Sequence, residues 1–281
     1  MAGAVVALVG VGVAACAGAA QKPGTPPFRA AFALPFDAYR LNDEDLVTVT
    51  AARTRLRREC MAKKGFVWTG KQSAADAHPL LSKNARRYGL ADSEAARRYG
   101  YHVPDTPQEA QAQAEEAAWA GRASKAEQSA LLGPGGCVDQ ADSALWKGVR
   151  DRDSAWLVDL EYAAVDQSAA DPAVVIATRA WSDCMRDNGF DYQTPQAAVE
   201  DRRWNLNVPK VSPAERAVAA ADVRCKQKTD LVTTRAAAEW RIQTKMIEQH
   251  AKRFEALRKA NQSYLGNARH TLDRRADSEA R

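Results

Sequence analysis

Aromatic residues are scarce in this sequence: they make up 7 % of the 281 residues, whereas hydrophobic residues as a class make up 46 %. Much of the hydrophobic content is alanine. Alanine is the strongest helix former, whereas β-sandwich cores need β-branched and aromatic side chains. No segment alternates apolar and polar residues for long enough to predict a strand. The composition therefore favours an all-α fold in a chain long enough to bury a core.

The motifs of common enzyme classes are also absent. The sequence has no G-x-S-x-G, no S-x-x-K followed by K-T-G, and no Walker loop. Paired carboxylates such as Asp151 and Asp153 lie in charged helical stretches, whereas glycosidase carboxylates act in a deep cleft. We therefore expect a protein that is not an enzyme.

Metal-ligand and nucleic-acid-binding patterns are missing too. No two of the 4 histidines form an i, i+4 pair around a glutamate, and the cysteines lack C-x-x-C spacing. The 40 basic and 35 acidic residues give a net charge of +5 that is spread along the chain, without an RNP, zinc-finger or helix-turn-helix motif. These absences predict no metal site, no cofactor and no nucleic-acid partner.

The first 20 residues carry no charge. Within them, the apolar stretch Ala4–Ala15 ends in small residues directly before Cys16. This pattern predicts a secretory signal over residues 1–15, and its Val-Ala-Ala-Cys end resembles a bacterial lipobox, in which the cysteine becomes the lipidated first residue. The match lacks a basic residue before the apolar stretch and has Val13 where leucine is commoner. An uncleaved membrane anchor and a cytosolic chain are the alternatives.

A diacyl lipid on Cys16 would hold the protein at the extracytoplasmic face of the cell membrane, because each buried CH₂ group contributes about 0.8 kcal/mol. Residues 16–41 then form a tether that is rich in proline and glycine in its first part. The apolar stretch Phe28–Tyr39 is expected to dock on the folded body. Four cysteines remain besides Cys16, an even number that suits disulfides in an exported chain.

Helix starts and stops are frequent after residue 41. Capping side chains precede a proline or an acidic first turn, and glycines mark the ends. The caps are Asn42, Thr106, Asp171, Thr194 and Ser212, and the stops are Gly65, Gly189 and the run Gly133–Gly136. From Pro213 to Asn261, apolar residues recur every 3.6 residues with no glycine and no further proline, which predicts one long C-terminal helix.

One motif occurs twice. Cysteine, methionine, glycine and phenylalanine have the same spacing in Cys60–Trp68 and in Cys184–Tyr192. If Gly65 occupies the left-handed position after a helix, Met61 and Phe66 form the hydrophobic pair of a Schellman cap, and the second copy repeats this arrangement. The motif therefore predicts two helix ends, each with a cysteine near its last turn.

Each motif is followed by one further cysteine. The sequence permits three pairings, of which Cys60–Cys137 with Cys184–Cys225 is the simplest. That pairing gives one disulfide to each of two related halves, residues 42–168 and 169–281. The predicted fold is an all-α helical bundle of these two disulfide-stapled halves with a long C-terminal helix.

Three features together resemble the uncharacterised lipoproteins common in high-GC actinobacteria: the run Leu34–Tyr39, the two Cys-Met-x-x-x-Gly-Phe motifs and the segment Ala220–Lys226. The resemblance extends from residue 34 to about residue 260. It implies a secreted, lipid-anchored protein, and it implies no activity.

Two Arg-Arg-Tyr-Gly units form the best candidate binding surface, because guanidinium groups and aromatic faces suit phosphates, carboxylates and sugar rings. The candidate residues are Arg86, Arg87, Tyr88, Arg97, Arg98, Tyr99 and Tyr101. The alternative needs no ligand: two short helices stop at Gly89 and Gly100, and their tyrosines pack in the core.

The resulting hypothesis is a non-enzymatic cell-envelope lipoprotein that binds a partner protein or a wall polymer, with the terminal helix as docking element. Charged replacements of Trp240 and Ile247 should unfold the protein if these residues are core and leave it folded if they face a partner. Two alternatives stay open. A cell-wall- or lipid-acting enzyme needs a deep pocket in which His102, Arg98 and a carboxylate converge, and a structural envelope spacer needs no binding surface.

Overall fold

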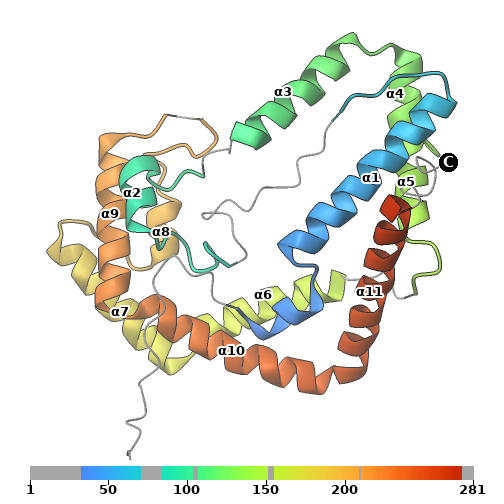
Figure 1. The fold of residues 1–281 in the computed structure, drawn as a ribbon. Helices are drawn as coiled ribbons and strands as arrows, with labels where there is room; N and C mark the ends of the chain where they lie inside the picture. Colours follow the sequence, from blue (N-terminus) through green and yellow to red (C-terminus); the bar gives the residue numbers. More distant parts are fainter. Residues whose placement is uncertain (1–32, 71–83, 104–106, 151–154, 209, 274–281) are drawn as a thin grey trace, which may run out of the picture.

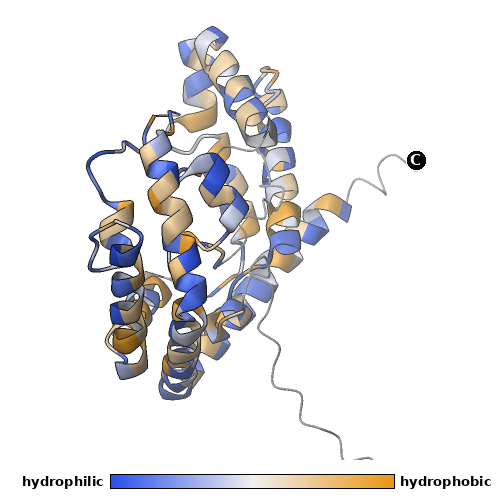
Figure 2. Cartoon of the chain, turned by 90° about the vertical axis from the view of Figure 1, so that its left-hand side faces the viewer, coloured by the Kyte–Doolittle hydropathy of each residue, from blue (hydrophilic) through white to orange (hydrophobic). Residues whose placement is uncertain are grey.

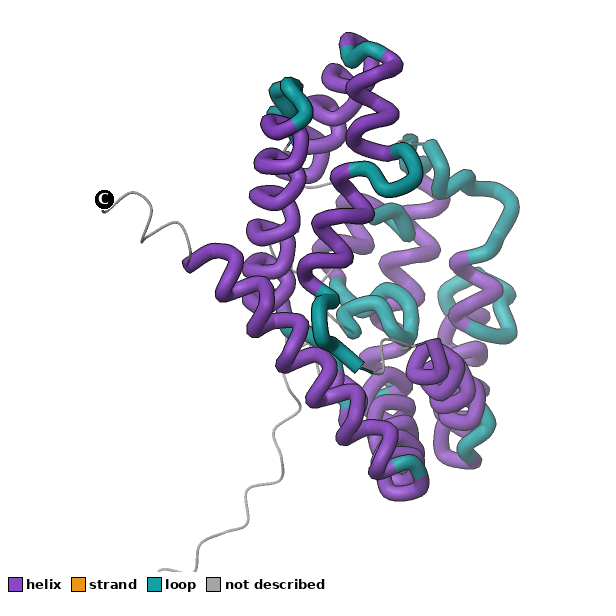
Figure 3. The backbone as a smooth tube through the Cα atoms, turned by 90° about the vertical axis from the view of Figure 1, so that its right-hand side faces the viewer, coloured by secondary structure: helices purple, strands orange, loops and turns teal. Residues whose placement is uncertain are grey.

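The computed structural model describes residues 33–70, 84–103, 107–150, 155–208 and 210–273 (Figure 1). These residues form helices and loops and contain no strand, which confirms the all-α prediction (Figure 3). The elements are the 3₁₀ helix η1 (Pro35–Tyr39) and the helices α1 (Asp43–Lys63), α2 (Ser93–Tyr99), α3 (Pro107–Arg122), α4 (Lys125–Leu132), α5 (Cys137–Leu145), α6 (Ala155–Ala169), α7 (Pro172–Asp187), α8 (Pro195–Val199), α9 (Pro213–Lys228), α10 (Leu231–Gln249) and α11 (Ala251–Asp273). The predicted signal peptide and Cys16 lie outside the described residues.

The segment after Pro213 forms three helices, so the prediction of one continuous helix is wrong. The first break lies at Asp230, whose φ of +49° is left-handed, and the second at His250. Threonine and aspartate at positions 229 and 230 are weak helix formers, and aspartate tolerates the left-handed region better than most residues do. As Figure 1 shows, α9, α10 and α11 follow successive sides of the molecule. With 23 residues, α11 is the longest described helix.

Each of these three helices packs against earlier parts of the chain. Helix α9 contacts α2 and α7, α10 contacts α6, α7 and η1, and α11 contacts α1 and α5. Because α1 and α2 precede residue 168 and their partners follow it, helix contacts cross the boundary between the two predicted halves. The C-terminal segment thus holds earlier helices in place at both ends of the molecule.

The core is divided among the places where these helices meet. Trp181 is fully buried in a cluster formed by α2, α7, α8, α9 and the first half of α10. Phe36, Trp156 and Phe254 form another cluster that joins η1, α6, α10 and α11. Burial of each such large side chain contributes roughly 1.5–3 kcal/mol. Figure 2 shows hydrophobic and hydrophilic residues alternating around the helices, as expected where only one side of a helix is covered.

Both copies of the repeated motif end a helix with a Schellman cap, as predicted. After α1, the Phe66 N–H donates to the Met61 carbonyl (2.9 Å), and Gly65, with a φ of +80°, donates to the Ala62 carbonyl (3.0 Å). The same two bonds close α7 at Gly189. Only glycine adopts this φ without steric cost, which explains its place in both copies.

The disulfides are Cys60–Cys137 and Cys184–Cys225, with Cα–Cα distances of 5.6 and 5.7 Å, which confirms the simplest pairing. The first joins the end of α1 to the start of α5, and the second joins α7 to α9. Each disulfide lies beside a Schellman cap. The motif therefore ends a helix and attaches that end to a neighbouring helix.

Removal of either disulfide is expected to lower the free energy of unfolding by about 4 kcal/mol, because the cysteines are 77 and 41 residues apart and the crosslinks restrict long loops in the unfolded chain. Urea unfolding of C60A/C137A and C184A/C225A, followed by circular dichroism, measures the loss without leaving a free partner thiol. A loss below about 1 kcal/mol in both double variants would contradict a stabilising role for the disulfides.

Candidate functional site

The first Arg-Arg-Tyr-Gly unit lies inside the protein. The Arg87 guanidinium forms a two-pronged ion pair with the fully buried carboxylate of Glu239 on α10. The buried Tyr88 hydroxyl donates to the same carboxylate (2.7 Å). Burial and the neighbouring carboxylate raise the pKa of Tyr88, so its hydroxyl stays a donor. A buried carboxylate needs such donors because an unpaired buried charge is costly.

Arg86 and Tyr101 also take part in internal contacts. Arg86 donates to the carbonyl oxygens of Tyr101 (2.8 Å) and His102 (2.9 Å). The Tyr101 ring is buried and stacks on Trp204, with 5.7 Å between the ring centroids. Burial, together with the nearby Asp222 carboxylate, raises the pKa of Tyr101. These contacts fix the course of the chain after α2.

The second unit faces outward. Arg97 and Arg98 are exposed on the last turn of α2, and the half-buried Tyr99 packs against the core. The Arg98 guanidinium lies over the Tyr99 ring, 5.0 Å from its centroid. The two units therefore do not form one surface. Arg97 and Arg98 are the members of the candidate set that lie in the open. The buried tyrosines agree with the alternative that needs no ligand, but its first short helix is wrong, because the chain before Gly89 forms turns.

A second buried ion pair joins Asp222 and Lys226, one turn apart on α9 (2.9 Å), and both side chains are fully buried. Lys226 also donates to the Leu90 carbonyl (2.9 Å), and the Trp181 indole donates to Asp222 (3.0 Å). Burial raises the pKa of the Asp222 carboxyl, and the Lys226 ammonium opposes this effect. The pair connects α9 to α7 and to the segment before α2.

His102 and Glu215 form a third buried pair, with 2.9 Å between Nδ1 and Oε1. The other ring nitrogen, Nε2, faces the carbonyl oxygens of Asn205 (3.2 Å) and Val208 (2.8 Å). A carbonyl oxygen only accepts, so Nε2 carries a proton. Gly100 has a φ of +56°, and a Cβ there would lie 2.4 Å from the Glu215 carboxylate, so glycine is required for this close approach.

This arrangement supports a structural role for His102. His102 and a carboxylate do converge, but Arg98 lies exposed on α2 and takes no part. The Nε2 atom, which a general base would offer to a substrate, is hydrogen-bonded to the backbone of the loop before α9. The pair joins the loop after α2 to the first turn of α9, and the Nε2 bonds join the same loop to residues 205–208.

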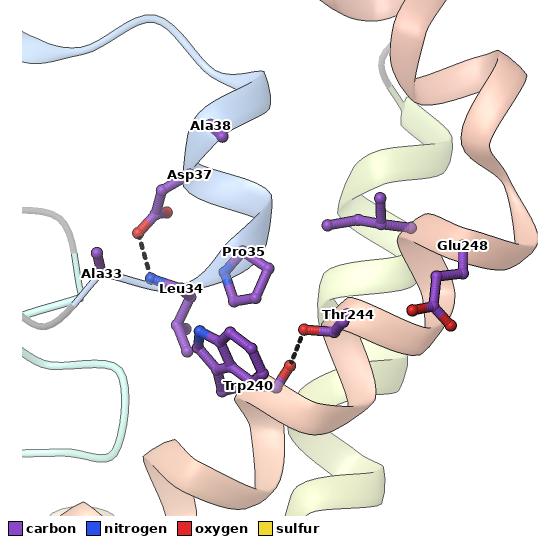
Figure 4. A pocket seen from close by; sticks show the side chains of 9 residues that line it. Ala33, Leu34, Pro35, Asp37, Ala38, Trp240, Thr244 and Glu248 are labelled. Carbon is purple, nitrogen blue, oxygen red and sulfur yellow. Dashed lines mark hydrogen bonds between the residues drawn. The ribbon is translucent and has the colours of Figure 1, made fainter.

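A shallow surface pocket lies between η1 and α10 and has a volume of about 410 Å³ (Figure 4). Its lining includes Leu34, Pro35, Ala38, Trp240, Thr244 and Ile247. Two of the polar groups in the lining are already engaged: the Thr244 hydroxyl donates to the Trp240 carbonyl (2.9 Å), and the Asp37 carboxylate accepts from the Leu34 N–H (2.8 Å). The pocket therefore offers mainly apolar surface. We call it the Trp240 pocket.

Trp240 itself is 52 % exposed, although it belongs to the apolar stripe that the sequence predicts. The side of α10 that is buried carries Glu239, Gln243 and Met246, so the indole lies beside the covered face. Ile247 is half-buried and packs against the cluster around Phe254. Of the two residues singled out in the terminal helix, Trp240 is the one that faces outward.

Sequence reasoning missed the buried partners Glu239 and Gln243, because charged and amide residues on a helix are usually exposed. Their position along the helix could have indicated burial, because both fall on the same helical side as Met246.

The expected docking of the stretch that ends at Tyr39 is confirmed for its described part, since Leu34 and Phe36 are buried. Among the described residues, no His, Cys, Asp and Glu side chains are grouped to hold a metal ion, and none of the described helices has the length and hydropathy to cross a membrane.

The loop between α8 and α9 is held by a polar cluster. Asp201 accepts hydrogen bonds from the Arg203 guanidinium (2.9 Å) and the Tyr192 hydroxyl (2.6 Å). The bond from Arg203 is the main reason that the pKa of Asp201 falls to about 2, and burial raises the pKa of Tyr192 to about 12. Asp201 is therefore ionised, and Tyr192 neutral, over most of the pH range.

Acid is expected to weaken this cluster. Because folding lowers the pKa of Asp201, its ionised carboxylate stabilises the folded protein at pH values above 3.8, the ordinary pKa of aspartate. This contribution is lost as the pH falls towards 2. Thermal unfolding midpoints over this range should fall more steeply for the wild type than for D201N, which lacks the titrating group. D183N, which alters the exposed Asp183–Arg186 pair, is the control. Parallel curves for wild type and D201N would rule out the Asp201 contribution.

Comparison with protein-family models, with characterised proteins and with solved structures finds no match. The predicted kinship with actinobacterial lipoproteins stays a prediction. What the protein binds has to follow from its own surface chemistry.

Proposed function

We propose that this protein is a non-enzymatic, lipid-anchored envelope protein that binds a partner protein through the Trp240 pocket. The exposed indole beside an apolar pocket carries the proposal, because tryptophan is the residue most enriched at the centres of protein interfaces. The apolar stretch before Cys16 supports export and lipidation. Two disulfides agree with an oxidising compartment.

The lining of the pocket favours an apolar side chain of a protein over a wall polymer. Sugar hydroxyls need hydrogen-bond partners, whereas Thr244 and Asp37 already bond within the protein. An inserted aliphatic or aromatic group would cover Trp240 and Pro35 and gain about 25 cal/mol for each Å² removed from water. Glu248 at the exposed rim would favour a basic residue next to that group.

The alternatives explain less of the structure. A structural spacer accounts for the helices and disulfides but gives no reason for an exposed tryptophan next to a pocket. We place an enzyme second because its expected centre, His102 with a carboxylate, is buried and bonded to backbone.

Replacement of Trp240 by alanine is expected to weaken partner binding at least tenfold, since truncation of a central aromatic residue costs roughly 2 kcal/mol or more. The measurement is crosslinking in intact membranes, followed by purification and mass spectrometry of proteins and wall fragments. Y162A is the matched control, because Tyr162 on α6 is 69 % exposed. Both variants should unfold at the urea concentration of the wild type.

A specific protein that is retained by the wild type and Y162A but lost from W240A supports the proposal. Equal retention by W240A and Y162A contradicts it. Retention of muropeptides in place of a protein, with the same dependence on Trp240, would replace the partner protein by a wall polymer.

The Cys16→Ser variant is expected to leave the membrane fraction after a high-salt wash, because the acyl chains that hold the protein are attached to this sulfur. Cell fractionation measures the shift, and intact mass of the wild type should show a diacylglyceryl-modified chain that starts at Cys16. If C16S stays in the salt-washed membrane with residues 1–15 attached, an uncleaved anchor helix replaces the lipid in this proposal.

A further inference from the structure

Two segments that are distant in the sequence meet at the end of α2: residues 95–103, and residues 202–208 together with Lys210. His102 bonds through Nε2 to the carbonyl oxygens of Asn205 and Val208. The Tyr101 and Trp204 rings stack beside this bond. We call the area that these segments expose the Val103 surface. In Figure 1 it lies at the side of the molecule formed by α2, α8 and α9.

Three aliphatic side chains are exposed on this surface. Val103 is 45 % exposed, and Leu206 and Val208 are each 41 % exposed. They lie on two loops that the His102 bonds join, so they belong to one area. A single exposed aliphatic residue is ordinary, and three on joined loops are the apolar part of the surface that we consider for binding.

The same two segments are rich in positive charge, and the nearest carboxylates in the sequence are Glu94 and Asp201, directly before them. They contain five arginine and lysine residues and no aspartate or glutamate. Arg97, Arg98, Arg202 and Lys210 are exposed, while Arg203 is bonded to Asp201. Exposed aliphatic side chains and exposed cations on the same segments are the composition of proteins that lie on anionic lipid surfaces.

Buried contacts hold the backbone of both loops of the Val103 surface. The buried His102–Glu215 pair fixes the backbone at Asn205 and Val208, and Arg86 fixes the carbonyl groups of Tyr101 and His102. The Trp204 indole donates to the Val199 carbonyl (3.0 Å). Because these contacts hold the backbone, the aliphatic side chains stay exposed without a partner, and little conformational entropy is lost on binding.

We propose that the Val103 surface docks the folded body on an anionic lipid bilayer. The cations would lie among lipid phosphates, and Val103, Leu206 and Val208 would enter the boundary with the acyl chains. A hydrophilic wall polymer would use the cations but leave the aliphatic side chains in water. This inference does not rest on the Trp240 pocket or on the lipid at Cys16, because it concerns a second contact made by the body itself.

The test uses the chain 17–281, which lacks the apolar N-terminal stretch and Cys16 but keeps every described residue. Its helical content is first compared with that of the full chain by circular dichroism. Co-sedimentation then measures partition onto vesicles of phosphatidylcholine with phosphatidylglycerol and onto vesicles of phosphatidylcholine alone. We expect binding to the anionic vesicles that weakens with salt.

Two double variants separate the contributions. R97Q/R98Q should lower the partition coefficient about 25-fold, since each basic side chain near an anionic bilayer contributes roughly a factor of five. L206S/V208S should lower it about tenfold through lost apolar contact. K252Q/K259Q on α11 and I176S on α7 are matched controls, because these lysines and Ile176 are also exposed. Neither control should bind more weakly than the parent chain.

Equal sedimentation with neutral and anionic vesicles would overturn the proposal, and so would controls that lose as much binding as the two double variants. Soluble polyphosphate provides a further arm. If it binds the chain in a way that depends on Arg97 and Arg98, and L206S/V208S keeps full vesicle binding, the surface is a site for anionic polymers and the bilayer is the wrong partner.

Discussion

The buried carboxylate of Glu239 is the interaction on which the first Arg-Arg-Tyr-Gly unit and the Trp240 pocket depend. It accepts hydrogen bonds from Arg87, Tyr88 and Gln243, and Gln243 accepts one from the Phe36 N–H (2.9 Å). This network places η1, which is one wall of the Trp240 pocket, and the segment that leads into α2, whereas the His102–Glu215 pair holds the loops of the Val103 surface. Loss of one partner from a buried ion pair costs about 3–5 kcal/mol. Substitutions in the network would therefore report on folding, and substitutions of exposed side chains such as Trp240 report on binding.

Features governed by short-range rules could be predicted from the sequence. The Schellman caps at Gly65 and Gly189 follow from local backbone preferences, and the caps at Asn42 and Ser212 follow from side-chain hydrogen bonding over three residues. The all-α class follows from composition and period. The prediction of one long helix was wrong at Asp230, because a 3.6-residue apolar stripe can continue through a bend when the helices on both sides keep one face buried.

Features governed by long-range pairing could not be predicted in the same way. Glu239 and Glu215 are fully buried, and each depends on a partner that the sequence does not identify: Arg87 lies 152 residues from Glu239, and His102 lies 113 residues from Glu215. One sequence alone gives no indication that these charged side chains pair in the folded protein. The exposure of Trp240 could not be predicted either, since an aromatic residue in an apolar stripe is normally part of the core.

The two Arg-Arg-Tyr-Gly units show why a motif alone does not define a site. The first unit lies in turns that bring Arg87 and Tyr88 to an acidic residue on another helix, and both side chains are used inside the protein. The second lies on α2, where helix geometry directs Arg97 and Arg98 to solvent. The same residue types thus serve packing in one copy and are free to meet an anionic partner in the other. What separates the two roles is whether the fold supplies a buried carboxylate within reach of the guanidinium.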